Sequence, residues 1–279
     1  MESITENLLP SPPLPPNQGV KNWRGWGLLL NVLVAVVALI GVGYLQWLGM
    51  QRPQKSLANQ QLAIQQEARR LETFKHLPPL GFDNLIADWI FLNFLQYFGD
   101  DARETTGFSL GAEYFDIITR RDPRFADIYP FLSSTISFYL ANPRLAVEYM
   151  QRGTRVLTPQ MHPRAFLVWR FKALDQLLLL GDIKGAIHSL EMAAKWGKGT
   201  PYEEYAKFYQ QTADFLKKDP NSTLVRFMAW NDVYYQSTDK KIKERARQEI
   251  LKLGAEERRD ENGEIFFVFP QSPNQNRSR

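Results

Sequence analysis

The chain has 279 residues, 44% of them hydrophobic, which is enough for one or two domains of ordinary size with a buried core. A net charge of +4 is far below that of a domain with a dense cationic face, so nucleic acid is not expected as a partner. The absence of cysteine excludes disulfides, thiolate metal sites and a cysteine nucleophile, and three scattered histidines leave little material for a histidine metal site. Composition points toward binding and away from catalysis, with no cofactor and no metal expected.

The first 22 residues are rich in proline, with Pro12-Pro13 and Pro15-Pro16 close together. Proline cannot continue a helix or donate to a sheet interior. Residues 1–22 are therefore predicted to be a disordered tail.

Residues 27–50, GLLLNVLVAVVALIGVGYLQWLGM, carry no charge. As a helix they would rise about 36 Å, enough to cross a hydrocarbon core of about 30 Å. Aromatic residues flank both ends of the stretch, where amphipathic rings prefer the headgroup level. The pattern predicts a transmembrane helix over 23–50 that contacts lipid through 27–50. A cleaved signal peptide and a buried core helix are the alternatives. A signal peptide would have a shorter apolar region with a small-x-small cleavage site after it.

The orientation of this helix depends on the basic residues near its ends. Two basic residues flank each end of the helix, so they give no preference for either orientation. Arg69 and Arg70 shift the count toward the C-terminal side, which places the domain after the helix in the cytoplasm.

Residues 51–77 are rich in Gln, Ala, Arg and Leu, and Leu57, Ile64 and Leu71 recur at seven-residue spacing. Two heptads are too few for a coiled coil, so a polar helical stalk, mostly a solvated spacer, is predicted. Pro78-Pro79 and Gly81 then end the helix.

Residues 78–254 form a succession of apolar segments at helical spacing, separated by Gly-Asp, Asp-Pro or Asn-Pro turns, with almost no alternation of period two. The predicted fold class is therefore all-α. Pro123 and Pro159 stand 36 residues apart and each follows a second helix. This spacing indicates helix–turn–helix repeats with a period near 34 residues.

The clearest unit, Leu167 to Pro201, has the turn Gly181-Asp182 between its two helices, and the preceding unit is Ala126 to Pro159. The residues that carry a family pattern in these two units are Ala146, Val147, Met150, Gly153 and Pro159, followed by Gly181, Ala186, Leu190 and Ala193. They resemble the packing positions of the tetratricopeptide repeat (TPR) family, which implies a TPR-like α-solenoid over 78–254. An irregular helical bundle is the competing interpretation.

An earlier unit, Asn84 to Pro123, departs from the family through extra residues between its helices. Its first helix, Leu85 to Phe98, is too short to span a bilayer. Burial of this helix at the start of the array is favoured over a position in the membrane interface. Interfacial helices normally carry Lys or Arg on the polar face, and this helix has neither. Residues 255–279 form a C-terminal extension and tail, with a turn at Asn262-Gly263 before an apolar segment.

No nucleotide-binding, hydrolase or zinc-protease motif occurs. Asp83, Asp88, Asp100 and Asp101 cluster in sequence but lack the ligand spacing of a calcium loop, so helix caps and turns explain them better.

The TPR resemblance implies that the first helix of each unit lines a concave groove. The positions that match the family's groove residues are Trp89, Asn93, Tyr97, Phe131, Thr135, Tyr139, Phe171, Asp175 and Leu178. This strip is aromatic and lacks the Lys and Arg clamp that captures a chain-terminal carboxylate, so an apolar helix or extended segment of another protein is the expected partner.

These features favour a non-enzymatic membrane-anchored adaptor that docks protein partners, expected to be membrane-complex subunits, during assembly or maintenance of the complex. The architecture is similar to single-span TPR proteins of photosynthetic membranes that assist photosystem biogenesis, which implies an inner or thylakoid membrane. A cell-envelope adaptor for secretion or wall assembly and an enzyme with an unfamiliar helical active site are the alternatives.

Overall fold

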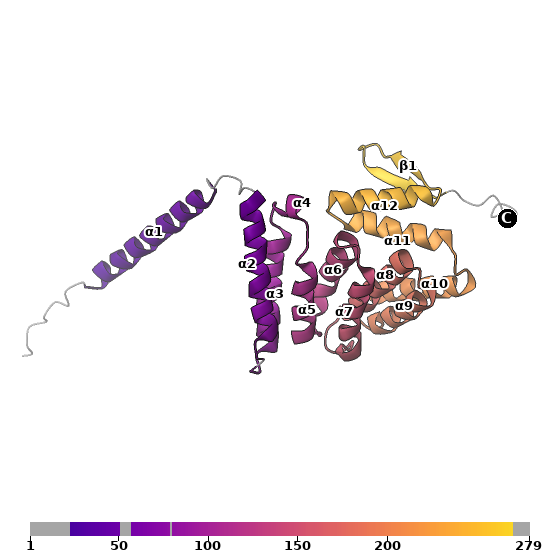
Figure 1. The fold of residues 1–279 in the computed structure, drawn as a ribbon, viewed down its shortest axis with the longest axis horizontal. Helices are drawn as coiled ribbons and strands as arrows, with labels where there is room; N and C mark the ends of the chain where they lie inside the picture. Colours follow the sequence, from indigo (N-terminus) through magenta and orange to yellow (C-terminus); the bar gives the residue numbers. More distant parts are fainter. Residues whose placement is uncertain (1–22, 51–56, 79, 270–279) are drawn as a thin grey trace, which may run out of the picture. The chain divides into compact units, whose positions relative to one another are not determined.

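A computed structural model describes residues 23–50, 57–78 and 80–269 of the chain (Figure 1). The predicted disordered tail, 1–22, the start of the predicted stalk and the end of the C-terminal tail lie outside these ranges. The chain divides into two compact units, 1–56 and 57–279.

The described part of the first unit is one helix, α1, Trp23–Met50, whose side chains are described over 30–44. Among the residues that the structure describes, none of the helices combines the length and the apolar character needed to cross a membrane. The membrane-spanning role of 27–50 therefore stays a prediction.

The second unit is built almost entirely of helices that follow one another in chain order (Figure 1). The α-helices are α2 (Leu57–His76), α3 (Asp83–Phe98), α4 (Arg103–Thr106), α5 (Gly111–Arg121), α6 (Tyr129–Leu132), α7 (Pro143–Val156), α8 (Leu167–Asp175), α9 (Ile183–Gly197), α10 (Glu203–Lys218), α11 (Thr223–Gln236) and α12 (Lys240–Lys252). A 3₁₀ turn, η1 (Ala126–Ile128), precedes α6, and π-helical segments extend α6 and α8 as η2 (Ser133–Tyr139) and η3 (Gln176–Leu180). The all-α prediction is confirmed, in a repeat-like arrangement.

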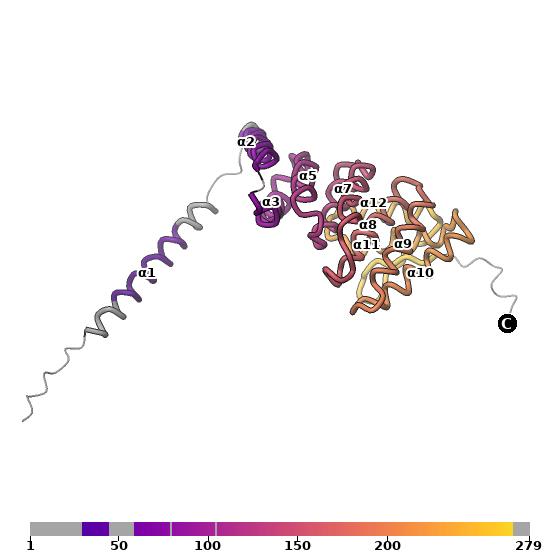
Figure 2. Tube along the Cα trace, turned by 90° about the horizontal axis from the view of Figure 1, so that it is seen from below, coloured from indigo at the N-terminus to yellow at the C-terminus, as the bar shows by residue number. Residues whose placement is uncertain are grey.

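Neighbouring helices in the sequence pack against each other, α3 on α5, α5 on α7, α7 on α8, α8 on α9 and α9 on α10. Figure 2 shows the same succession from a second direction, and α11 packs on η3 and on α12. Each helix buries one apolar face against the next, so one continuous core runs from α2 to α11.

Two units of the array repeat at an offset of 40 residues. The pattern of buried, half-buried and exposed residues in 131–150 is identical to that in 171–190 at every position. The first helix of each unit ends in the same wide turn, in which Asn142 N–H donates to Ile136 O and Asp182 N–H to Gln176 O, both at 2.9 Å. The period is longer than the predicted 34 residues because of these π-helical endings and the long connection between α7 and α8.

The same turn chemistry starts the second helix of both units. Ala141 and Gly181 adopt positive φ angles of 51° and 66°. The Asn142 side chain then accepts a hydrogen bond from Leu145 N–H at 3.2 Å, and Asp182 accepts one from Gly185 N–H at 2.9 Å. Both residues are N-caps, which satisfy donors that the first turn of a helix leaves free.

Four of the small residues at predicted packing positions, Ala146, Gly153, Ala186 and Ala193, are buried, whereas Gly181 is exposed in the turn. Ala146, Ala186 and Ala193 are fully inaccessible to solvent, and Met150 lies beside them in the core. A Cβ atom on Gly153 would lie 2.0 Å from the Tyr129 hydroxyl, so only glycine fits at this point of α7. These positions let successive helices approach closely.

The predicted stalk is a helix, α2, but the structure packs it on the array where the sequence predicts a mostly solvated spacer. Leu71 is buried and Ile64 contacts the core, so the seven-residue spacing marks the face that docks. The Tyr114 hydroxyl of α5 donates to Glu67 Oε1 at 2.7 Å, and Arg121 of α5 donates to the carbonyl of Leu77. Because most residues of α2 are polar, its composition does not indicate this narrow apolar face.

Helix α3 buries Ala87, Ile90, Phe94 and Tyr97, as the favoured interpretation of this segment requires. Its opposite face is exposed and apolar. Leu85, Trp89 and Leu92 are 65%, 51% and 55% accessible.

The C-terminal end of the array is a hairpin of helices, α11 and α12, with a two-stranded antiparallel sheet beyond it. The strands β1 (Glu256–Arg259) and β2 (Ile265–Val268) pair with Glu256 opposite Val268. Phe267 stacks edge-on against Tyr234 of α11, and Phe269 contacts Phe227. The apolar segment after the Asn262-Gly263 turn therefore folds back on the last helices.

Candidate functional site

The structure does not bring the nine predicted groove residues onto one surface. Phe131 and Tyr139 line an open groove together, whereas Asn93 and Tyr97 border a smaller pocket beside α2. Trp89 lies on the exposed outer face of α3. The remaining four, Thr135, Phe171, Asp175 and Leu178, line none of the larger pockets described here.

Thr135 and Asp175 are fully buried between successive helices, which corrects their assignment to a groove. Thr135 lies against α5, where its γ-methyl carbon would be 2.3 Å from a Cβ atom on Gly111. Asp175, its equivalent 40 residues on, accepts hydrogen bonds from the hydroxyls of Ser133 and Ser137. Both side chains contact a helix of the preceding unit, so both residues connect one unit to the unit before it.

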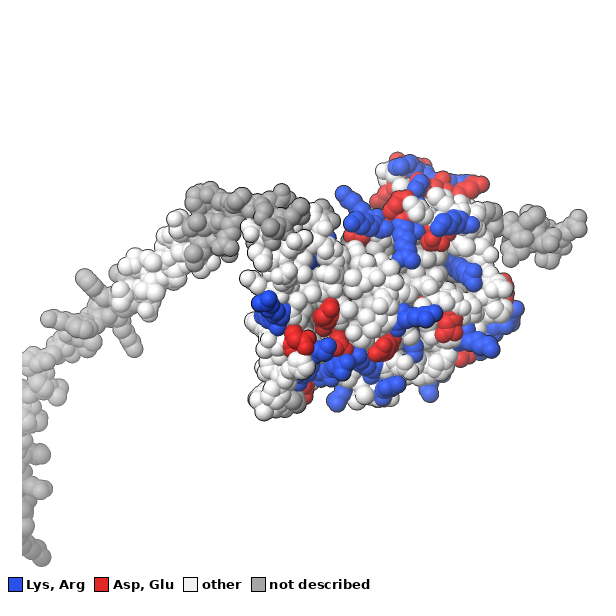
Figure 3. All heavy atoms as spheres, in the orientation of Figure 1, with Lys and Arg blue, Asp and Glu red and all other residues white. Residues whose placement is uncertain are grey.

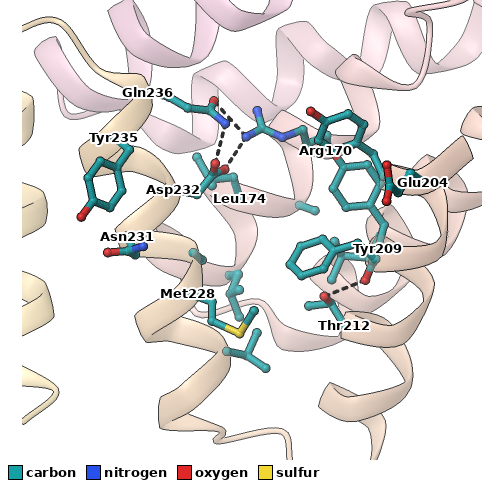
Figure 4. Close-up of a pocket in the computed structure, with 17 residues that line it drawn as sticks. Arg170, Leu174, Glu204, Tyr209, Thr212, Met228, Asn231, Asp232, Tyr235 and Gln236 are labelled. Atoms are coloured by element: carbon teal, nitrogen blue, oxygen red, sulfur yellow. Dashed lines mark hydrogen bonds and ion pairs between the residues drawn. The ribbon is translucent and has the colours of Figure 1, made fainter. Parts of the chain in front are cut away.

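An apolar cleft of about 610 Å³ lies between α8, α10 and α11 and is here called the C-terminal cleft (Figure 4). Its two walls are the facing sides of α10 and α11. The large apolar side chains that line it are Leu174, Leu177, Tyr205, Phe208, Met228 and Tyr235. Tyr205, Phe208 and Met228 remain 58%, 44% and 41% exposed, so the described chain leaves these walls uncovered.

Two of the three charged groups that line the cleft, Arg170 and Asp232, bind each other, and the third is Glu204 (Figure 4). Arg170 of α8 forms an ion pair with Asp232 of α11 and donates a hydrogen bond to Gln236 Oε1 at 3.0 Å. Tyr209 lies next to this pair, and burial raises the pKa of its hydroxyl to about 12. With Arg170 neutralised, the interior of the cleft presents apolar surface to a ligand.

Sequence reasoning missed this cleft because 202–254 matches the repeat pattern poorly. A signal is present in α10, which buries Ala206, Tyr209 and Ala213 on one face. Tyr205 and Phe208 border this face and widen the apolar surface of the helix. An apolar surface wider than the face that packs on the neighbouring helices leaves a part that the described fold does not cover.

The groove lined by Phe131 and Tyr139 has a volume of about 1040 Å³ and is called the aromatic groove below. Phe98 of α3 and Phe108, which follows α4, complete its floor, and the start of α12 forms the opposite wall. Only Gln236 lines both this groove and the C-terminal cleft.

Within the described ranges, no three or more His, Asp or Glu side chains are grouped so that they could hold a metal ion. The architecture is an all-α, repeat-like fold with two hollows that the described chain leaves open. Comparison of the chain with models of known protein families, with characterised proteins and with solved structures found no match.

Proposed function

We propose that the protein is a non-enzymatic, membrane-anchored adaptor that docks apolar segments of other proteins in the C-terminal cleft. The observation that carries this proposal is the cleft itself, an apolar hollow whose walls at Tyr205, Phe208 and Met228 are exposed. Soluble surfaces rarely leave such contiguous apolar area uncovered unless it binds something.

The occupant that fits is the apolar face of an amphipathic helix from a partner protein. Two helices, α10 and α11, form the walls, and a third helix can lay its i, i+3 and i+4 side chains between them. Arg170 and Asp232 neutralise each other, so of the charged groups that line the cleft only the exposed carboxylate of Glu204 has no ion-pair partner among the described residues. An apolar segment therefore fits the cleft better than a charged one.

The setting that we propose is the cytoplasmic side of an inner or thylakoid membrane, with subunits of a membrane complex as partners. The uncharged stretch 27–50 supports the anchor, and the basic residues after it support this orientation. The likeness to TPR assembly factors of photosynthetic membranes supports a role in photosystem biogenesis. These proposals share one requirement, that the chain is held at the bilayer.

Placing a photo-crosslinkable amino acid at Met228, in the full chain in its native membrane, should yield crosslinks to apolar helical segments. Gln210, on the exposed face of α10 away from the cleft, is the matched control position. The variant Met228→Arg is tested with the crosslinker moved to Tyr205. Recovery of the same partner should fall by about thirtyfold, because losing a binding hot spot costs about 2 kcal/mol.

Equal crosslinking from Met228 and Gln210 would show that the cleft is not the binding surface. So would crosslinked segments dominated by charged residues. Because Met228 is 41% exposed, Met228→Arg should leave the thermal midpoint nearly unchanged, which separates loss of binding from loss of the fold.

The membrane anchor has its own test. The full chain should stay in the membrane pellet after an alkaline carbonate wash. Val36→Arg with Leu39→Arg should release it, because each Arg at the centre of a span costs about 3 kcal/mol. Leu62→Arg, at an exposed position of α2, is the control that should stay bound. Release of the wild type by the wash would contradict the anchor.

A further inference from the structure

The aromatic groove adjoins the C-terminal cleft at Gln236 but has a different chemistry. Its floor is a continuous set of rings contributed by α3, the segment after α4, and η2. Phe98 contacts Phe108 and Tyr139 at centroid distances of 5.2 and 6.0 Å, and Phe108 lies 4.0 Å from Tyr139. These rings present an apolar surface without filling the groove above it.

Helix α12 adds a row of cations along one wall of this groove. Lys240, Lys241 and Arg245 all line it and all are exposed. Arg245 lies 5.7 Å from the ring of Phe138, which joins the cationic wall to the aromatic floor. In Figure 3, Lys and Arg side chains project from the end of α12 nearest α4, beside a surface without charge.

These three cations are uncompensated within the described part of the chain. None of them forms an ion pair there, in contrast to Arg247 and Lys252 of the same helix, which pair with Glu257 and Glu249. Asp239, the carboxylate nearest to them in sequence, accepts a hydrogen bond from Ile242 N–H at 2.9 Å as the N-cap of α12. Burial and the neighbouring Asp239 carboxylate raise the pKa of the Tyr139 hydroxyl.

The opposite wall of the groove carries carboxylates, so the two walls differ in charge. Asp100 and Asp101 line it beside Arg103, whose guanidinium stacks 4.3 Å over the ring of Tyr97. Asp100 is used locally, as acceptor from Ala102 N–H at 2.9 Å. The opposite wall therefore carries two carboxylates and one cation, whereas the α12 wall carries three cations and Asp239, so the net positive charge of the groove lies on the α12 wall.

We propose that the aromatic groove binds an acidic amphipathic segment of a partner protein, with its apolar side chains on the rings and its carboxylates facing α12. The charges of the α12 wall select acidic residues on one edge of the segment, and Asp100 and Asp101 repel them on the other. Complementary charge fixes the orientation of a bound segment and speeds its association.

Two other anionic surfaces fit this groove less well. A bilayer is nearly flat and cannot reach a floor that lies between two walls. A nucleic acid presents phosphates along its whole length and would meet Asp100 and Asp101 on the α3–α4 wall. A protein segment can carry its charge on one edge only.

The test uses the full chain in detergent micelles and a fluorescent helical peptide with a Leu/Phe stripe and a Glu stripe. Two control peptides replace Glu by Lys, or Leu and Phe by Gln. The first peptide should bind best, with affinity that falls as salt is raised from about 50 to about 300 mM. Lys240→Glu, Lys241→Glu and Arg245→Glu together should weaken its binding by about tenfold or more and favour the Lys peptide.

The matched control is Lys195→Glu, Lys198→Glu and Lys218→Glu, which makes the same charge change at exposed positions outside the groove. Equal loss in this control, or equal affinity of the wild type for the Glu and Lys peptides, would overturn the proposal. So would absence of binding up to about 100 μM peptide. The wild type is also tested with phosphatidylglycerol vesicles and with single-stranded DNA. If the α12 variant loses binding of one of these but keeps binding of the peptide, the α12 wall binds that ligand and the proposal is wrong.

Discussion

Ala186→Glu is expected to destabilise the helical array by about 3 kcal/mol or more, because it places an unpaired carboxylate where no solvent reaches. Ala186 lies on α9, which packs between α8 and α10, so neither neighbour can move aside without opening the core. A domain of this size has about 10 kcal/mol of total stability, so the loss is a large fraction of it.

Denaturant unfolding of the full chain in detergent measures this change. Lys184→Glu, at an exposed position of the same helix, adds the same side chain and should shift the free energy of unfolding by less than about 0.5 kcal/mol. Ala146→Glu should match Ala186→Glu, since the two alanines occupy equivalent positions of the 40-residue repeat. A small effect at either alanine would contradict that equivalence.

The elements that could be predicted are those whose signals are local. The Gly181-Asp182 turn, the helices on either side of it and the buried alanines follow from turn chemistry and helical spacing within a few residues. The period of 40 residues could not be predicted in the same way. Pro123 and Pro159 mark the ends of helices, but the wide turns before Asn142 and Asp182 depend on backbone hydrogen bonds that side-chain patterns do not reveal.

The candidate site was harder to predict because it depends on which helix faces which. Phe131 and Tyr139 were predicted to lie on an open surface, and they do line one. Thr135 lies on the same helical segment but faces α5, where Gly111 leaves room for it. Helical spacing indicates which residues share a face, and only the packing of the neighbouring unit decides whether that face is open.

The cations of the aromatic groove could not be predicted from helical spacing either. The sequence strip has no Lys or Arg clamp of its own, and the structure supplies cations from α12, more than a hundred residues further along the chain than Phe131. Lys240 and Lys241 read in sequence as part of a charged, solvated helix. Their position opposite the aromatic floor depends on how the α11–α12 hairpin lies across the array.

The stability of the array is expected to fall by about 4 kcal/mol between about pH 4 and about pH 7 through Asp175 alone. Burial raises the pKa of this carboxyl from 3.8 to about 7, and the hydroxyls of Ser137 and Ser133 offset only part of that rise. The unfolded chain therefore releases the Asp175 proton at a lower pH than the folded chain does.

The sign follows from that order of proton release. Stability from this site is fully present below about pH 4 and is lost at about 1.4 kcal/mol per pH unit until the folded carboxyl ionises near pH 7. Asp175→Asn keeps the shape of the side chain and cannot ionise. The difference in unfolding free energy, variant minus wild type, should therefore grow from pH 4 to pH 7 and stay constant above it.

Urea unfolding of both proteins at half-unit intervals from pH 4 to pH 8.5 measures this difference, and subtraction removes all other titrating groups. Asp88→Asn, which makes the same substitution on the exposed face of α3, is the matched surface control. A flat difference for Asp175→Asn would mean that Asp175 is ionised throughout, with Ser133 and Ser137 stabilising its charge. A growing difference would establish that a protonated carboxyl joins two repeat units, which explains why Asp175 is buried at the position where the sequence predicts a groove residue.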